Sequence, residues 1–196
     1  MSKKTDNFYN RFSFFYPLVD IILRPQKRRL FAEINALPFG NLLEIGVGDG
    51  KHLSLYKSHK ITGIDTSASM LRLAKKRQKD NIDLIQMNGE QLLFPAGVYD
   101  YVVLSHVIAV VDNPETLLGE IYRVLKPGGK IFILNHFTPG NCLKYLDKSF
   151  QSLSGIFHFK SVFYANSLIS LQKFTLLEEI SFTRFSYFKL LIYGKA

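Results

Sequence analysis

The chain has 196 residues, of which 47% are hydrophobic and 14% aromatic, so it favours one globular domain and excludes a disordered chain. Its single cysteine, Cys142, excludes an intramolecular disulfide, and without a cluster of thiols and histidines we expect no metal site. The formal net charge of +9 predicts an acidic partner, either anionic lipid or nucleic acid.

Residues 5–37 are expected to form helical pieces, with Pro17 and Pro25 each placed in a first helical turn. Apolar side chains recur there at spacings of four and three residues, at Phe8, Phe12, Phe15, Val19 and Ile22. The longest apolar run, 12–23, is too short to span a bilayer, and the N-terminus lacks a secretory cleavage site.

This first segment is also basic, because seven Lys/Arg and two Asp give residues 1–30 a net charge of +5. A basic amphipathic helix rich in Phe is suited to a membrane interface. The alternative, which is compatible with the first, is a lid packed over a pocket of the core. We therefore expect one domain over 1–196, with a lid or membrane-contact segment at 1–37 and a core at 38–196.

Residues 42–50 (LLEIGVGDG) predict a buried strand over 41–45 that turns sharply into a helix over 50–57. The glycines at 46, 48 and 50 allow unusual backbone dihedrals and the close approach of a nucleotide-like cofactor. The third glycine comes one residue too early for a dinucleotide fingerprint. Glu44 and Asp49 make the loop acidic, which favours a cationic cofactor. A tight turn without a ligand is the alternative.

Strands and helices alternate after this loop, which predicts an α/β fold with a doubly wound, mostly parallel sheet. Strands are expected at 61–65, 82–86, 101–105 and 130–135, and helices at about 67–79 and from Pro114 to the turn at 126–129. The last two apolar runs, 176–182 and 188–193, have no room for a helix between them. They predict an antiparallel hairpin at the C-terminus.

Three motifs in this order resemble the class I S-adenosylmethionine-dependent methyltransferases, over roughly residues 38–137. They are the glycine loop, the strand-end Asp65 followed by Ser67 and Met70, and RVLKPGG at 123–129. Within that class, the stretches 99–104, 110–115 and 131–137 look most like bacterial phospholipid N-methyltransferases. Quinone-biosynthesis C-methyltransferases are the close competitor. The resemblance implies a seven-stranded Rossmann-like sheet, S-adenosyl-L-methionine as cofactor and S-adenosyl-L-homocysteine as product.

The resemblance also implies a set of cofactor-binding residues. The main chain at Gly46, Gly48 and Gly50 would line the methionine part, and Asp65 would accept both ribose hydroxyls. Asp65 lies 19 residues beyond Gly46, an offset at which a strand-end acid receives a ribose, although a helix N-cap is its alternative role. The remaining expected cofactor contacts are Glu44, Thr66, Met70, Asn88, Gly89 and Ser105. Met70 is as readily a core residue, and Asn88 departs from the family's usual Asp.

Methyl transfer to an amine requires removal of a proton, because a protonated ammonium has no lone pair, and histidine is the natural base. His106 lies at the expected carboxyl end of one strand and His136 at that of the next, beside the crevice of a doubly wound sheet. Tyr9 and Tyr16 on the first segment are candidates for orienting the acceptor. Each of these four residues has a purely structural role as its alternative.

These observations predict stepwise methylation of phosphatidylethanolamine toward phosphatidylcholine by a monomer on the inner, cytoplasmic face of the membrane. The enzyme would touch the anionic lipid surface peripherally through its basic segment. A quinone precursor or another small molecule is the alternative acceptor. Nucleic acid is not expected as a partner, because the basic residues are interleaved with Phe and Ile and no nucleic-acid motif is present.

Overall fold

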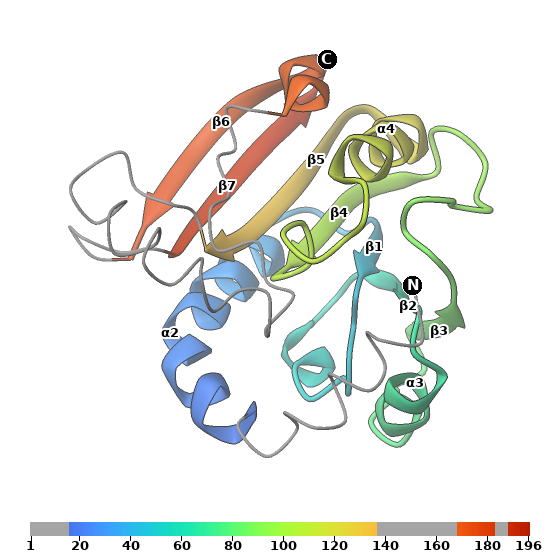
Figure 1. The fold of residues 1–196 in the computed structure, drawn as a ribbon, viewed down its shortest axis with the longest axis vertical. Coiled ribbons are helices and arrows are strands. Elements are labelled where there is room, and N and C mark those ends of the chain that lie inside the picture. Colours follow the sequence, from blue (N-terminus) through green and yellow to red (C-terminus); the bar gives the residue numbers. More distant parts are fainter. Residues whose placement is uncertain (1–15, 137–167, 183–187) are drawn as a thin grey trace.

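The computed structural model describes residues 16–136, 168–182 and 188–196, and within these one seven-stranded sheet is flanked by helices on both faces (Figure 1). The strands are β1 Asn41–Ile45, β2 Lys60–Asp65, β3 Ile82–Gln86, β4 Tyr99–Ser105, β5 Leu125–His136, β6 Phe174–Ser181 and β7 Phe188–Lys195. The helices are α2 Tyr16–Asn35, α3 Ala68–Lys75 and α4 Pro114–Val124, with short 3₁₀ turns at Leu53–Leu55 (η2) and Ile169–Lys173 (η4).

The strand order is β3-β2-β1-β4-β5-β7-β6, in which β1 to β5 run parallel and β7 is antiparallel to both of its neighbours. Ile45 at the end of β1 pairs with Ile64 of β2 on one side and Leu104 of β4 on the other. The carboxyl ends of these strands therefore meet where the chain order reverses, which is the position of the ligand crevice in open α/β sheets. The predicted doubly wound sheet and C-terminal hairpin are confirmed.

The sheet buries a hydrophobic core on each face. On one face α4 and η4 cover β1, β4 and β5, and α4 inserts Leu117, Leu118, Ile121 and Val124. On the other face the last turns of α2 contact β5 and β7, and the buried side of α3 contacts β2 and β3, with Leu30 and Ile34 fully buried. This two-sided burial explains why the central strands read as continuous apolar runs.

The first segment differs from its prediction, because α2 is one 20-residue helix and Pro25 lies inside it instead of opening a new piece. Its C-terminal end is fastened to the core by His59, whose Nε2 donates to Ile34 O at 2.9 Å. Asn35 adds two hydrogen bonds with the 55–57 stretch, to Leu55 O and from Lys57 N. Tertiary packing of this kind outweighs the cost of a proline in a helix. Among the described residues, no helix is both long and apolar enough to cross a membrane.

The helix predicted over 50–57 is wrong, since that stretch holds only a turn and the 3₁₀ element η2. Leu53 and Tyr56 are both buried, and their spacing of three residues suits a 3₁₀ turn as well as an α-helix. The chain then has only three residues, 57–59, before β2 begins. The helix predicted at 67–79 forms, but it ends earlier, at Lys75.

Candidate cofactor and acceptor site

The glycine loop leaves β1 with its first residues still bonded to the neighbouring strand, since Gly46 N and Val47 N donate to Ile64 O at 2.7 and 3.1 Å. Gly46 has φ +80°, and a Cβ there would collide with the Val107 side chain. Gly48 has φ +56°, and a Cβ there would have no atom of the described residues within 4 Å. The first glycine is thus required by close packing, whereas the second borders open space that a ligand can enter.

Asp65 ties the end of β2 to this loop. One carboxylate oxygen, Oδ2, accepts from Gly48 N at 2.8 Å, and the other, Oδ1, accepts from Ser67 N at 2.8 Å. Burial raises the pKa of Asp65 above its usual range, and the N–H groups of Ser67, Gly48 and Thr66 partly offset that rise. Ser67 caps α3, because its Oγ accepts from Met70 N at 3.3 Å. Asp65 itself receives the N–H of Ser67 and not that of a helical residue.

Glu44 lies in β1 with 1% of its surface exposed, and both of its carboxylate oxygens are already engaged. Tyr56 Oη donates to Oε2 at 2.9 Å, and His52 Nε2 lies 2.7 Å from Oε1. The rings of His52 and Tyr56 both pack against Phe31 of α2, with centroids 5.8 and 4.8 Å away. Burial, followed by the negative charge of Glu44, raises the pKa of Tyr56 well above its ordinary value.

His52 and Tyr56 were not among the residues predicted for the site. Their positions, eight and twelve residues after Glu44, show no pattern that marks a pair of partners for a buried acid. A physical signal was present nevertheless, since a carboxylate inside a buried strand must find hydrogen-bond donors. The stretch that returns toward β2 supplies them.

Asn88 and Gly89 follow β3 at the same edge of the sheet. Asn88 is exposed, and its Oδ1 accepts from Glu90 N at 3.0 Å, leaving the second lone pair of that oxygen for another donor. Gly89 is buried, with Ile45 and Leu117 side chains so close that a Cβ would lie 2.7 and 2.9 Å from them. Met70 and Thr66 are half-buried beside Asp65.

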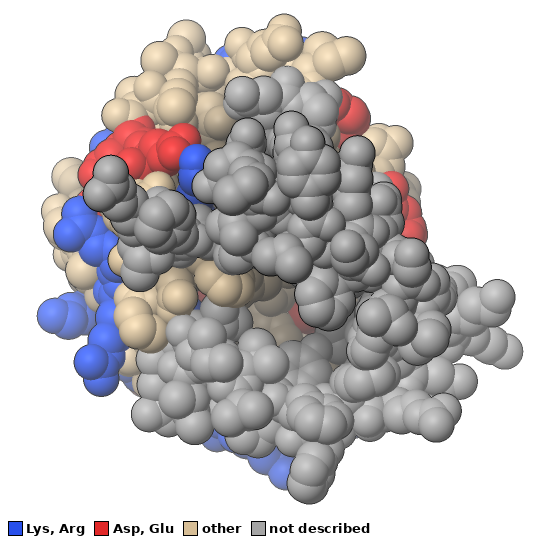
Figure 2. All heavy atoms as spheres, turned by 60° about the vertical axis from the view of Figure 1, so that its left-hand side comes forward, with Lys and Arg blue, Asp and Glu red and all other residues tan. Residues whose placement is uncertain are grey.

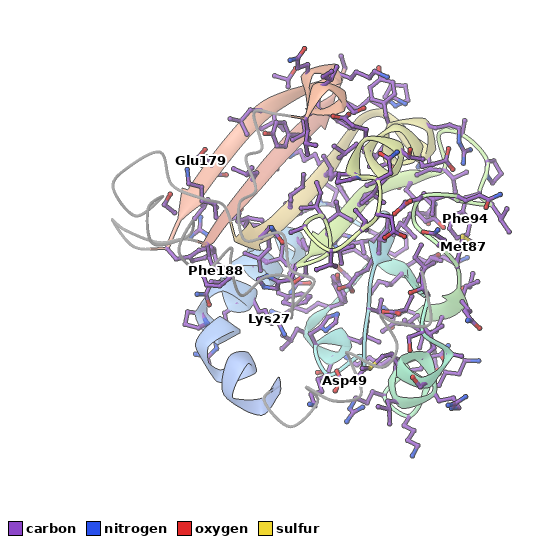
Figure 3. All side chains as sticks on the ribbon, viewed as in Figure 1. Lys27, Asp49, Met87, Phe94, Glu179 and Phe188 are labelled. Carbon is purple, nitrogen blue, oxygen red and sulfur yellow. The ribbon has the colours of Figure 1, made fainter. Side chains whose placement is uncertain are left out.

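Ser105 and His106 end β4 at the carboxyl edge of the sheet. His106 has φ +61°, the one non-glycine residue with positive φ in the described part of the chain, and its N donates to Leu134 O at 2.8 Å. Its ring meets the edge of the Phe188 ring, with centroids 5.8 Å apart. Phe188 begins β7, pairs with His136 of β5 and is labelled in Figure 3. A strained residue at such a position marks a site where the fold holds a side chain in place.

The structure therefore brings Asp65, the glycine loop and Ser105–His106 to one edge of the sheet. His136 also ends its strand there, although only its backbone is described. Tyr16 is described only as the first residue of α2, and Tyr9 lies outside the described residues. Where the structure is described, no three His, Cys, Asp or Glu side chains come together in a way that would hold a metal ion.

This arrangement fits S-adenosylmethionine. Open space faces Gly48 among the described residues, and the Asp65 carboxylate, which accepts from Gly48 N and Ser67 N, has further lone pairs for a diol. Exposed Asn88 lies at the same sheet edge and is separated from the glycine loop by β2. Backbone N–H groups and a carboxylate suit the ribose and the cationic amino-acid end of such a molecule.

Comparison with known proteins agrees with this geometry. Residues 43–133 match the family model of a methyltransferase domain. The chain is 40% identical over 119 residues to a phosphatidylethanolamine N-methyltransferase of Cereibacter sphaeroides, covering 57% of this chain and 58% of that protein. It is 32% identical over 122 residues to a ubiquinone/menaquinone biosynthesis C-methyltransferase of Desulfotalea psychrophila, covering 60% of this chain and 50% of that one. The chain thus spans between half and three-fifths of these two relatives' length.

A solved structure with the same fold is a S-adenosylmethionine-dependent methyltransferase of Thermotoga maritima, described as a possible histamine N-methyltransferase. It superposes with a TM-score of 0.72 at 23% identity, covering 97% of this chain and 99% of that one. The domain match, the strand order and the strand-end acid agree with one another. Residues 43–133 match a methyltransferase domain, and the chain has the fold of the class I S-adenosylmethionine-dependent methyltransferases.

Proposed function

We propose that this protein uses S-adenosylmethionine to methylate the amine of phosphatidylethanolamine, stepwise toward phosphatidylcholine, at the inner surface of the membrane. The observation that carries the proposal is the 40% identity to the phosphatidylethanolamine N-methyltransferase. The glycine loop and Asp65 are the reason for proposing this cofactor, and the basic residues of α2 are the reason for proposing contact with a lipid surface. The cofactor, when bound, supplies a methyl group on a positively charged sulfur.

The residues of the chain then have three tasks. Gly46, Gly48 and Asp65 hold the cofactor, so that positioning and exclusion of water provide most of the acceleration. His106 takes a proton from the acceptor ammonium, because the nitrogen attacks only through its free lone pair. The left-handed backbone of His106 and its contact with Phe188 fix the imidazole at the carboxyl end of β4. His136, Tyr9 and Tyr16 remain candidates for orienting the amine.

The membrane contact is assigned to the N-terminal segment, including α2. Within its described side chains, Arg28 and Arg29 are exposed and Lys27 is half-buried. Figure 2 shows blue Lys and Arg atoms along the left edge and at the bottom of the view. Each cation near an anionic lipid surface contributes about 1 kcal/mol of attraction. This binding is peripheral, and in this proposal the protein acts as a monomer.

The test is incubation of the purified protein with cofactor labelled on its methyl group and vesicles of phosphatidylethanolamine and phosphatidylglycerol. We expect labelled mono-, di- and trimethylated lipid from wild-type protein and none from the Asp65→Ala variant. Vesicles of phosphatidylglycerol alone provide the blank. A preparation that binds S-adenosylhomocysteine by calorimetry yet labels no lipid would refute the lipid acceptor without refuting the cofactor.

A second candidate is C-methylation of a quinone precursor, which the 32% identity to the Desulfotalea enzyme favours. Such a reaction removes a proton from carbon instead of nitrogen. A total lipid extract, incubated with labelled cofactor and separated by chromatography, distinguishes the two, because label appears in either the phospholipid or the quinone fraction.

A further inference from the structure

The segment between β3 and β4 that contains Asn88 and Gly89 contacts both ends of α4. We call residues 87–94 the adenine-side loop; Met87 and Phe94, its first and last residues, are labelled in Figure 3. At the N-terminal end of α4, Glu90 Oε1 accepts from Asp112 N at 2.9 Å and Asn113 N at 3.2 Å. Asn113 is the N-cap of α4, so this carboxylate also lies at the positive end of the helix dipole.

At the C-terminal end of α4, Arg123 holds the other end of the loop. Its Nη1 donates to Phe94 O at 2.7 Å, and its Nη2 donates to Leu92 O at 2.8 Å. Glu120 completes the clamp, because its Oε2 accepts from Leu92 N and both of its oxygens accept from Arg123, at 2.8 to 2.9 Å. The hydrogen bond to Arg123 keeps the pKa of Glu120 below its usual range, so the pair stays ionised at neutral pH.

Between these two ends, the loop backbone rests directly on the helix. Gly89 has space only for its hydrogen, since a Cβ would lie 2.9 Å from Leu117 of α4 and 2.7 Å from Ile45 of β1. Within the loop, Glu90 N donates to Asn88 Oδ1, so the position of Glu90 sets the direction of the Asn88 side chain. The contacts that position the adenine-side loop therefore lie on its side toward α4, opposite the side that would meet the adenine ring.

We propose that Glu90 and Arg123 are positioning residues, which hold Asn88 and Gly89 against the adenine ring of the cofactor from the two ends of α4. This inference rests on the proposed cofactor, and neither residue touches the ligand. Glu90 ties the loop to the segment that follows His106, whose next residue, Val107, packs on Gly46. These contacts thus connect the adenine-side loop, the end of β4 and the glycine loop to one another.

The chain offers a matched control at the same end of α4. Lys195 Nζ donates to Tyr122 O and Leu125 O, each at 2.7 Å, and lies over the Tyr122 ring, so these contacts involve no residue of the adenine-side loop. Lys195→Met therefore removes, and Arg123→Lys weakens, a charged group's hydrogen bonds to two backbone carbonyls beside α4. Glu90→Gln keeps the Oε1 acceptor, whereas Glu90→Ala removes it.

The experiment measures calorimetric affinity for S-adenosylhomocysteine and for its 6-oxo analogue, S-inosylhomocysteine, together with the melting temperature of each variant. We expect Arg123→Lys and Glu90→Ala to lose about tenfold in affinity for the adenine ligand, which corresponds to about 1.4 kcal/mol, since each weakens or removes charged hydrogen bonds that hold the loop. Affinity for the inosine ligand should fall less than about twofold, because this ligand lacks the amino group whose hydrogen bond Asn88 would accept. Glu90→Gln should restore most of the discrimination between the ligands.

Lys195→Met should lower the melting temperature while leaving the preference for adenine unchanged. The proposal is overturned if Lys195→Met and Arg123→Lys weaken binding equally, or if both ligands lose affinity by the same factor in every variant. Failure of the wild-type protein to bind S-adenosylhomocysteine would instead overturn the cofactor assignment, and this inference with it.

Discussion

Asp65 combines burial, which favours its neutral form, with backbone N–H groups that favour its charged form. Burial dominates, so its pKa lies above the ordinary value of 3.8, and protonation begins at a higher pH than for a free aspartate. A protonated carboxyl has lost acceptor capacity toward a ribose diol. Because the folded pKa is raised, this group also contributes less folding stability as pH rises from its unfolded value through its folded value.

We therefore predict that affinity for S-adenosylhomocysteine falls as pH decreases through the raised pKa of Asp65. Calorimetric titrations over an acid pH series give the midpoint of that loss. The Asp65→Asn variant should bind weakly with little pH dependence, since it cannot ionise. A parallel loss of affinity in wild type and variant would assign the titration to another group.

Tyr56 and Glu44 make a hydrogen bond between a fully buried phenol and a buried carboxylate. Tyr56→Phe leaves Oε2 of that carboxylate without its donor, which costs about 1 to 3 kcal/mol in free energy of unfolding. Tyr101→Phe is the matched control, because Tyr101 Oη donates at 3.1 Å to the carbonyl of Pro38, a neutral acceptor next to exposed residues. Urea denaturation measures the free energy of unfolding of both variants. Equal losses would show that the hydrogen bond from Tyr56 to Glu44 is worth no more than one to a neutral carbonyl.

His106 has two separable properties, an unusual backbone conformation and an imidazole. Asparagine tolerates the left-handed region but is not a base, so His106→Asn isolates the chemical role. We predict a loss of about 10² to 10⁴ in the methylation rate with unchanged affinity for S-adenosylhomocysteine. His106→Ala should add a loss of stability. A rate within threefold of wild type for His106→Asn would make His106 structural.

The residues of the site that the sequence could predict are those fixed by local pattern. Gly46 and Gly48 adopt positive φ, and Asp65 lies at the strand end beside the loop. Their assignment to the cofactor rested on the resemblance and stays a prediction. His52 and Tyr56 could not be found in this way, since their contact with Glu44 depends on how the chain turns after the loop.

At the scale of elements, the central strands were predictable because each is an apolar run between turn residues, and burial on both faces preserves that signal, whereas the edge strands β3 and β6 are largely exposed. The helices were less predictable. The short η2 has the same spacing of buried residues as an α-helix, so periodicity could not separate the two. Pro25 indicated a break in α2, but the packing of Leu30, Phe31 and Ile34 keeps the helix continuous.

That conflict in α2 is itself testable. A proline inside a helix removes a backbone donor and crowds the preceding turn, at a cost of about 3 kcal/mol in a helix interior. We predict that Pro25→Ala raises the free energy of unfolding, by about 1 kcal/mol or more. Pro17→Ala should have little effect, because Pro17 is the second residue of α2, where no donor is needed. Equal changes in urea denaturation would mean that the helix relieves the strain at Pro25.

At the scale of the whole molecule, the excess positive charge is concentrated near one end of the chain, and Arg28 and Arg29 are exposed on α2. If α2 faces anionic lipid, its charges attract the surface while those on distant elements contribute little, because attraction decays within a Debye length of about 8 Å at physiological salt. The location of a charge should then matter more than the net charge.

We predict that the double variant Arg28→Ser/Arg29→Ser binds phosphatidylglycerol vesicles roughly tenfold to thirtyfold more weakly at low salt, since two cations contribute about 2 kcal/mol. Arg72→Ser/Lys75→Ser removes the same charge from exposed positions of α3 and is the control. Vesicle co-sedimentation at two salt concentrations measures both, and the difference should shrink at high salt. Equal losses in the two double variants would mean that net charge, and not α2, draws the protein to lipid.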